Sequence, residues 1–153
     1  MVDKVLFSSE TGEWQTPKWL FDKINNLWKI HLDPCTTEDN PLKTPYFFSK
    51  ETNGLKSSWY GNVFVNPPYN KEIEKWLQKA KYELDTNRYV DHIIFLLPAR
   101  TDTKWFHQYI YDDFILRLRP EVVYLWFIKG RLKFGNSKNS APFPSMVVVF
   151  KKP

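Results

Sequence analysis

The chain has 153 residues, a length that fits one domain, and 42% of its residues are apolar while 25% are charged. This composition excludes a disordered chain and a fibrous repeat, and no apolar stretch is long enough to cross a membrane. A single cysteine excludes an intramolecular disulfide and a multi-cysteine zinc site, and the three histidines lack the spacing of metal ligands. The net charge of +5 is a modest bias toward a polyanionic partner.

The N-terminal part of the chain predicts one helix and one strand. Residues 1–10 lack the long apolar region of a signal peptide, so we expect the chain to stay in the cytoplasm. Thr16 suits a helix N-cap and Pro17 the first helical position, and apolar residues then recur at helical spacing over 20–28. The alternating residues 29–33 predict a strand that ends at an aspartate.

The middle of the chain combines an irregular stretch with two regular elements. Residues 34–59 are rich in Pro, Thr, Asn, Ser and Gly, and only 46–48 are typical of a strand. Irregular stretches of this length are often functional. Residues 62–66 predict a strand that two prolines stop, and apolar positions at helical spacing over 73–84 predict the next helix.

The C-terminal part predicts one short helix and four strands. Residues 92–97 are a nearly continuous apolar run, which is typical of a strand buried on both faces. Residues 105–110 suggest the helix, and 114–118, 122–128 and 145–151 predict closing strands, the last two joined by a loop rich in Gly, Asn and Pro. Helices that alternate with buried strands predict an α/β sheet covered on both faces, with its site beyond the carboxyl ends of the strands.

The clearest chemical signal is the tetrapeptide Asn66-Pro67-Pro68-Tyr69 at the end of a predicted strand. The two prolines fix φ and force Asn66 to be extended, so the turn is rigid before a ligand binds. The Asn66 side-chain oxygen and the Pro67 carbonyl are acceptors that suit the two N–H groups of a planar amine. The Tyr69 ring can stack on the ring that carries this amine. The alternative is a turn that ends the strand, with a packed tyrosine.

Further segments stand in a consistent order around this tetrapeptide: Trp14-Gln15-Thr16-Pro17, Asp33-Pro34-Cys35-Thr36-Thr37-Glu38-Asp39-Asn40, Phe47-Phe48, Asn53-Gly54-Leu55 and Trp59 before it, and Leu96–Thr103, Gly130–Phe134 and Ala141–Ser145 after it. Asn-Pro-Pro-Tyr resembles the amine-binding motif of amino-group methyltransferases that use S-adenosylmethionine. Over nearly the whole chain, the set resembles the small phage-type DNA N6-adenine methyltransferases.

This resemblance implies a fold and an activity. The fold would be a minimal class I (Rossmann-like) methyltransferase: a mainly parallel twisted sheet with helices on both faces and a C-terminal β-hairpin, all in one domain over residues 1–153. The activity would be methyl transfer from S-adenosylmethionine to the N6 amine of an adenine flipped out of double-stranded DNA, with Asn66, Pro67, Pro68 and Tyr69 as the catalytic turn. No metal and no membrane would be involved, and a chain from a phage or prophage would act in the host cytoplasm.

The resemblance also implies a set of cofactor-binding residues. Asp33 would hold the methionyl ammonium of the cofactor, the helix N-terminus at Thr16 would receive its carboxylate, and Glu51 is a candidate for the ribose hydroxyls. The structural alternatives are a strand-end cap for Asp33, a helix cap for Thr16, and a solvated side chain for Glu51. Trp14 could be core, and Cys35 could be a small packing residue. The full set is Trp14, Thr16, Pro17, Asp33, Pro34, Cys35, Asn40, Glu51 and Asn53.

The chain departs from the family pattern at two places. No glycine follows Asp33 until Gly54, so the glycine-rich first loop of most such methyltransferases is absent. Asn53 stands where the family commonly has Asp, so one acidic contact to the cofactor becomes neutral. Both departures concern the affinity for the cofactor.

Three cations near predicted strand ends, Arg100, Arg131 and Lys133, are expected to bind DNA phosphates or the displaced strand. The alternative is that they are solvated surface cations. At this length we expect no separate target-recognition domain.

Two other functions compete with this interpretation. Asn-Pro-Pro-Tyr also serves amino-group methyltransferases that act on RNA or on a protein glutamine. A catalytically silent, basic DNA-binding module would bind DNA without depending on the cofactor.

Overall fold

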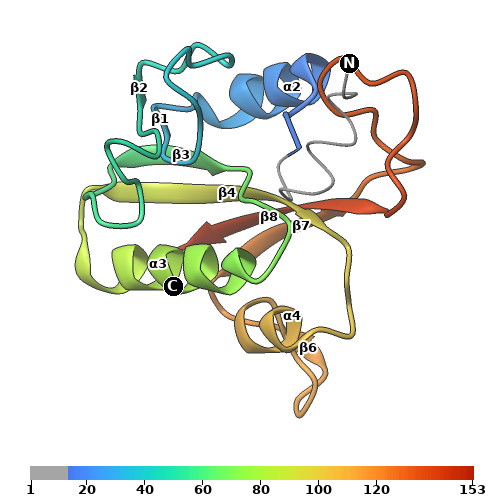
Figure 1. The fold of residues 1–153 in the computed structure, drawn as a ribbon. Helices are drawn as coiled ribbons and strands as arrows, with labels where there is room; N and C mark the ends of the chain where they lie inside the picture. The colour runs from blue at the N-terminus through green and yellow to red at the C-terminus, as the bar shows by residue number, and fades with distance from the viewer. Residues whose placement is uncertain (1–13) are drawn as a thin grey trace.

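A computed structural model describes residues 14–153, which form a six-stranded sheet between helices (Figure 1). Residues 1–10, on which the cytoplasmic expectation rests, lie outside the described part of the chain. The elements in chain order are α2 (Lys18–Trp28), β1 (Leu32–Asp33), β2 (Tyr46–Phe47), β3 (Gly61–Val65), α3 (Glu72–Thr86), β4 (Val90–Pro98), α4 (Lys104–Tyr109), β5 (Tyr111–Asp112), β6 (Arg117–Leu118), β7 (Val122–Phe127) and β8 (Ser145–Lys151).

The sheet has the strand order β2-β1-β3-β4-β8-β7. The first four of these strands are parallel, whereas β8 runs antiparallel to both of its neighbours, β4 and β7. Strand β4 lies near the middle, and Ile93–Leu97 have no exposed surface, as predicted for a strand buried on both faces. The mainly parallel α/β sheet and the antiparallel pair at its C-terminal end are therefore confirmed.

Helices cover both faces of the sheet, as the sequence predicted. Helix α2 lies on one face, and α3 and α4 lie on the other (Figure 1). The apolar positions predicted for α3 are the ones that it buries against the sheet: Ile73, Trp76, Leu77, Ala80 and Leu84. This amphipathic pattern fixes which side of α3 faces the core.

The strand predicted at 114–118 is wrong for most of its length. Strands β5 and β6 form a small hairpin, and its tip carries Phe114, which is 92% exposed. The Asp112 carboxylate accepts hydrogen bonds from the backbone N–H groups of Phe114 and Ile115, at 3.0 and 3.4 Å, and Leu116 has a positive φ of 57°. This turn chemistry overrides the β propensity of the apolar residues.

Two boundaries near the N-terminus also differ from the prediction. Only the last two residues of the predicted strand 29–33 are in β1, because Lys29 has a φ of 50° and ends α2 with its N–H bonded to the Asn25 carbonyl. Pro17, with extended backbone, is the N-cap of α2, so Thr16 is not the cap. The Thr16 hydroxyl instead accepts a hydrogen bond from another element, the turn after β3.

Candidate active site

Two strand ends bring the main candidate residues together. The chain passes from β1 out to β2 and returns to form β3 on the other side of β1. In open α/β sheets, ligand crevices form at such reversals of strand order, beyond the carboxyl ends of the strands. Asp33 is the last residue of β1, and Asn66 directly follows β3, so both lie at this reversal.

A cavity of about 860 Å³ occupies this position, a size that suits a small-molecule ligand. Its wall comes from the segment before α2, from α2 itself, the loops between β1 and β3, the turn after β3 and the first part of α3. Of the predicted residues, the cavity brings together Trp14, Thr16, Asp33, Pro34, Cys35, Glu51, Asn53, Asn66 and Pro68. The other predicted residues do not line it: Pro17, Asn40, Pro67, Tyr69, Arg100, Arg131 and Lys133.

The Asn66 side chain is oriented by its amide nitrogen. This nitrogen donates to the Thr16 hydroxyl at 2.9 Å and to the Trp14 backbone carbonyl. The side-chain oxygen is buried and has no hydrogen-bond partner among residues 14–153. A buried acceptor without a donor is unfavourable, so this oxygen has unused capacity to accept a hydrogen bond from an N–H group.

Tyr69 is packed rather than open. Its side chain is 6% exposed, and its hydroxyl donates to the Leu96 carbonyl at 3.1 Å. Burial raises the pKa of this hydroxyl well above its ordinary value, so it remains a donor. The rings of Phe143 and Phe134 stand edge-on to the Tyr69 ring, with centroids at 5.5 and 6.0 Å, and Trp14 contacts both phenylalanines at 5.3 Å. We call these four residues the aromatic plug.

The loop between β7 and β8 holds two members of the plug in place. The Gly135 N–H donates to the Gln15 carbonyl at 2.9 Å, which joins this loop to the segment before α2. Leu132 and Phe134 are buried, whereas the alternating Arg131 and Lys133 are exposed. The same loop therefore contributes Phe134 to the aromatic plug and exposes Arg131 and Lys133 to solvent.

Asp33 carries the clearest electrostatic signal. It is 3% exposed, and burial raises its pKa from 3.8 to about 7, against the smaller opposing effects of hydrogen bonds from the Cys35 backbone and the Thr36 side chain. Among the described residues, no Lys or Arg forms an ion pair with it. A cationic group of a ligand would supply the missing partner.

A second acidic part of the wall is formed by Glu38, Ser49 and Glu51. The buried Ser49 hydroxyl lies within hydrogen-bond distance of both carboxylates, 2.9 Å from that of Glu51. A hydrogen bond from the backbone N–H of Glu51 itself, and then the bond to Ser49, lower the pKa of Glu51, so it stays ionised. Carboxylate oxygens at a cavity wall can accept hydrogen bonds from ligand hydroxyls.

Backbone conformation explains the residues at 53 and 54. Asn53 has a φ of 55°, a region that Asn and Asp tolerate better than most residues, and its side chain adds no charge to the wall. A Cβ atom on Gly54 would lie 1.9 Å from the Pro34 carbonyl oxygen. The Gly54 carbonyl also accepts a hydrogen bond from the Trp59 indole at 2.8 Å. Gly54 thus allows the two loops of the wall to approach each other.

Two predicted cofactor residues have structural roles in the wall. The Asn40 amide donates to the Thr44 carbonyl at 3.0 Å, and its oxygen accepts from the Thr44 hydroxyl at 3.3 Å, which closes the loop after β1. Pro17 is buried as the N-cap of α2. Both side chains support the wall from outside the cavity.

The predicted DNA-binding cations lie beside the plug. The Arg100 guanidinium stands over the Phe143 ring, 5.8 Å from its centroid. Arg131 and Lys133 are exposed on the loop that carries Phe134. The three charges and the plug therefore belong to one region next to Asn66.

Several residues that line the cavity were not predicted from the sequence as site residues. Phe21, Leu55 and Trp76 form apolar parts of the wall, and the sequence pattern marked Trp76 only as the buried face of a helix. Glu38 lies inside the segment 33–40, which was a usable signal. Ser49 had none, because its role depends on Glu38, a carboxylate that the fold brings to it from the loop after β1.

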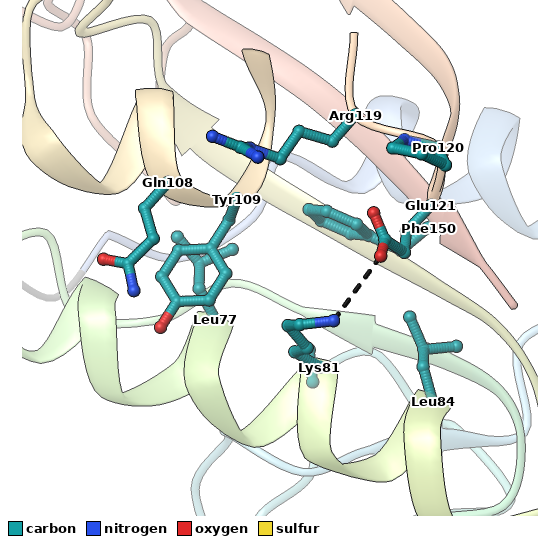
Figure 2. A pocket seen from close by; sticks show the side chains of 10 residues that line it. Leu77, Lys81, Leu84, Gln108, Tyr109, Arg119, Pro120, Glu121 and Phe150 are labelled. Atoms are coloured by element: carbon teal, nitrogen blue, oxygen red, sulfur yellow. Dashed lines mark hydrogen bonds and ion pairs between the residues drawn. The ribbon is translucent and has the colours of Figure 1, made fainter. Parts of the chain in front are cut away.

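A smaller cavity of about 190 Å³ lies on the face of the sheet that α3 and α4 cover, between these helices and the start of β7 (Figure 2). Lys81 spans it to reach Glu121, with 3.4 Å between the charged atoms. None of the residues predicted to act in catalysis or binding lines this cavity.

No helix in the described part of the chain has both the length and the apolar character needed to span a membrane. Among residues 14–153, no group of three or more His, Cys, Asp or Glu side chains is placed to hold a metal ion. The family model of DNA N-6-adenine-methyltransferase (Dam) matches residues 5–153. A search of the curated proteins found no match.

Proposed function

The chain belongs to the DNA N-6-adenine-methyltransferase (Dam) family and is a DNA adenine N6-methyltransferase, and we propose how it acts. One class I (Rossmann-like) domain over residues 1–153 transfers a methyl group from S-adenosylmethionine to the N6 amine of an adenine flipped out of double-stranded DNA. The observation that carries the proposal is the buried oxygen of Asn66, which has no hydrogen-bond partner within residues 14–153 and lies on a rigid turn at the edge of the large cavity.

The donor groups of the cavity fit S-adenosylmethionine. Asp33 is a buried carboxylate that lacks a cationic partner among the described residues, and it suits the methionyl ammonium. Glu38 and Glu51, held by Ser49, suit the ribose hydroxyls, and Phe21 and Trp76 offer apolar surface to a purine ring. The cofactor supplies an electrophilic methyl group, so the protein needs mainly to align the amine with it.

Asn66 and Pro67 perform this alignment. The Asn66 oxygen and the Pro67 carbonyl accept the two N–H groups of the adenine amine, which favours pyramidal geometry at nitrogen. With S-adenosylmethionine bound, its methyl carbon would be the electrophile for the nitrogen lone pair that these two acceptors orient, and the proton lost from N6 would be released after transfer. The hydrogen bonds from the Asn66 amide to Trp14 and Thr16 fix the side chain before the base arrives, so little reorganisation is needed.

The base enters through the aromatic plug. A base inside a duplex cannot reach a recessed amine pocket, so the adenine is flipped out and stacks on Tyr69. Because Phe134 and Phe143 stand against the Tyr69 ring, they must move aside first. The loop that carries them also exposes Arg131 and Lys133, so phosphate binding and opening of the plug occur on one segment. We propose that the enzyme acts in the cytoplasm, of the host cell if a phage or prophage encodes it.

The test is methyl transfer from labelled S-adenosylmethionine by the full chain, offered in parallel to duplex DNA, RNA and a glutamine-containing peptide. We expect label only in DNA, at adenine N6, and its loss in Asn66→Ala with cofactor affinity nearly unchanged. Label in RNA or in the peptide would assign the enzyme to another amine substrate. DNA binding with no transfer and no cofactor binding would identify a silent module.

A further inference from the structure

Strand β7 forms one end of the sheet, and no strand of the described part of the chain pairs with its outer backbone edge. Among the described residues, its only strand partner is β8. The Ile128 N–H donates to the Ser145 carbonyl, toward β8. With the period of two of a strand, Leu125 and Phe127 direct their backbone N–H and C=O groups outward.

Most of this edge lacks the features that usually protect one: a register irregularity between Val122 and Tyr124 interrupts the pairing near its start, but the pairing is regular over Tyr124–Phe127. Proteins place Lys, Pro or inward-pointing charges on exposed edge strands, but 122–127 reads Val-Val-Tyr-Leu-Trp-Phe without any of them. Val123, Tyr124 and Phe127 are 42%, 62% and 55% exposed. An apolar strand with free backbone groups is a template for pairing with another strand.

The apolar surface continues from β7 onto α2. Tyr124 packs against Trp28, with ring centroids 5.9 Å apart, and Lys23 lies over the Trp126 ring at 4.7 Å. Leu27 on the same helix is 64% exposed. The open edge is thus flanked by an aromatic surface that a partner can also cover.

The charges at the two ends of the strand identify the partner. Glu121 directly precedes β7, and the exposed Lys129 follows its last residues. An antiparallel second copy brings the Glu121 end of each strand to the Lys129 end of the other, whereas a parallel copy would bring like charges together. The pattern is therefore complementary to itself under a two-fold axis, which is the commonest symmetry of protein dimers.

We infer that β7 is the interface of a homodimer, in which two copies pair antiparallel through this edge and join their sheets. The inference is independent of the proposed methyl transfer, because the interface contains none of the residues of the active site. Within one copy, Glu121 also forms an ion pair with Lys81 at the smaller cavity.

The experiment measures the molar mass of the full chain by sedimentation over a dilution series. We expect a reversible dimer that Phe127→Lys dissociates, because a lysine on the edge opposes strand pairing. The matched control is Phe114→Lys, which changes an even more exposed aromatic residue on the β5–β6 hairpin and should leave the dimer intact. Circular dichroism shows whether each variant is folded.

Charge reversal tests the antiparallel register separately. Glu121→Lys and Lys129→Glu should each weaken the dimer roughly tenfold or more, and the double variant should recover it. Loss of the Lys81–Glu121 pair cannot explain this recovery, because Lys129→Glu does not restore that pair. A monomer at every concentration, a dimer that survives Phe127→Lys, or a double variant no tighter than the single ones would overturn the proposal.

Discussion

The two halves of the candidate active site differ in how much open space they offer to a ligand. The half next to β1 is an open cavity whose wall already carries Asp33 and the Glu38–Ser49–Glu51 cluster. The half next to the Asn-Pro-Pro-Tyr turn is filled by the enzyme's own rings, with Tyr69 only 6% exposed. Both halves lie at the carboxyl ends of neighbouring strands, so the sheet does not cause the difference.

This difference indicates an order of binding. In the proposed mechanism, the open half accepts S-adenosylmethionine in the free enzyme, whereas DNA displaces Phe134 and Phe143 from the closed half. The buried oxygen of Asn66 lies between the two halves, because Asn66 also lines the open cavity. The following predictions test the two halves separately.

The largest effect is expected in the closed half, at Asn66. Asn66→Ala should raise the activation free energy of methyl transfer by several kcal/mol, because an aligned acceptor at the reacting amine is lost. Asn66→Asp is the informative partner, since it keeps the oxygen but removes the amide N–H that holds Thr16. Single-turnover methyl transfer, with calorimetric cofactor affinity in parallel, separates the two effects. Turnover near that of the wild type in Asn66→Ala would refute the amine pocket.

The next largest effect concerns Asp33 in the open half. Asp33→Asn, or Asp33→Ala, should weaken cofactor binding by about 1.5–3 kcal/mol, the range for a hydrogen bond to a charged group. The pKa of Asp33 near 7 adds a pH dependence: binding of an ammonium requires the ionised carboxylate, so wild-type affinity should rise about tenfold per pH unit up to pH 7 and then level off. Calorimetry between pH 5.5 and about 7.5 measures both effects, and Asp33→Asn should lose the slope.

The raised pKa of Asp33 also predicts how the stability of the ligand-free protein depends on pH. Because folding raises the pKa of Asp33 from 3.8 to about 7, the folded state holds a proton that the unfolded chain has released at intermediate pH. This contribution to stability is present below about pH 4 and is lost as pH rises toward 7, by at most about 1.4 kcal/mol per pH unit. Asp33→Asn should therefore gain stability relative to wild type as pH rises, as measured by denaturant unfolding. An equal difference at pH 4 and pH 8 would show that the Asp33 pKa is not raised.

Substitutions of Tyr69 also test the closed half, with a smaller expected effect on activity than those of Asn66. Tyr69→Ala should weaken capture of the flipped adenine by about 1–3 kcal/mol, the value of one stacking surface. Tyr69→Phe keeps the ring and should retain most activity, although losing the bond to the Leu96 carbonyl should cost about 0.5–1.5 kcal/mol of stability. Methyl transfer and the fluorescence of 2-aminopurine at the target position report on capture. Equal activity in both variants would remove stacking from the mechanism.

The two halves also differ in how much of each could be predicted from the sequence. Asp33 and Asn66 were predictable as strand-end residues, because periodicity located both strands and two prolines ended the second. The plug was not predictable, since Phe134 and Phe143 belong to an irregular loop and meet Tyr69 only after the last strand pairs with β4. Asn40 shows the opposite problem: it lies in a motif, yet its side chain closes a loop by bonding to Thr44.

The smallest effect is expected at the cations outside the plug. Arg131→Ala or Lys133→Ala should weaken binding to all duplexes by a similar factor and reduce the slope of log affinity against log salt by roughly one unit, because each removes one phosphate contact. Lys152→Ala is the matched control: it removes the same charge beyond the end of β8, near the start of β4 and away from the strand ends of the site. Its slope should equal that of the wild type. If a variant instead loses affinity for one sequence only, the side chain contacts a base, and the loop that closes the plug would also read the DNA.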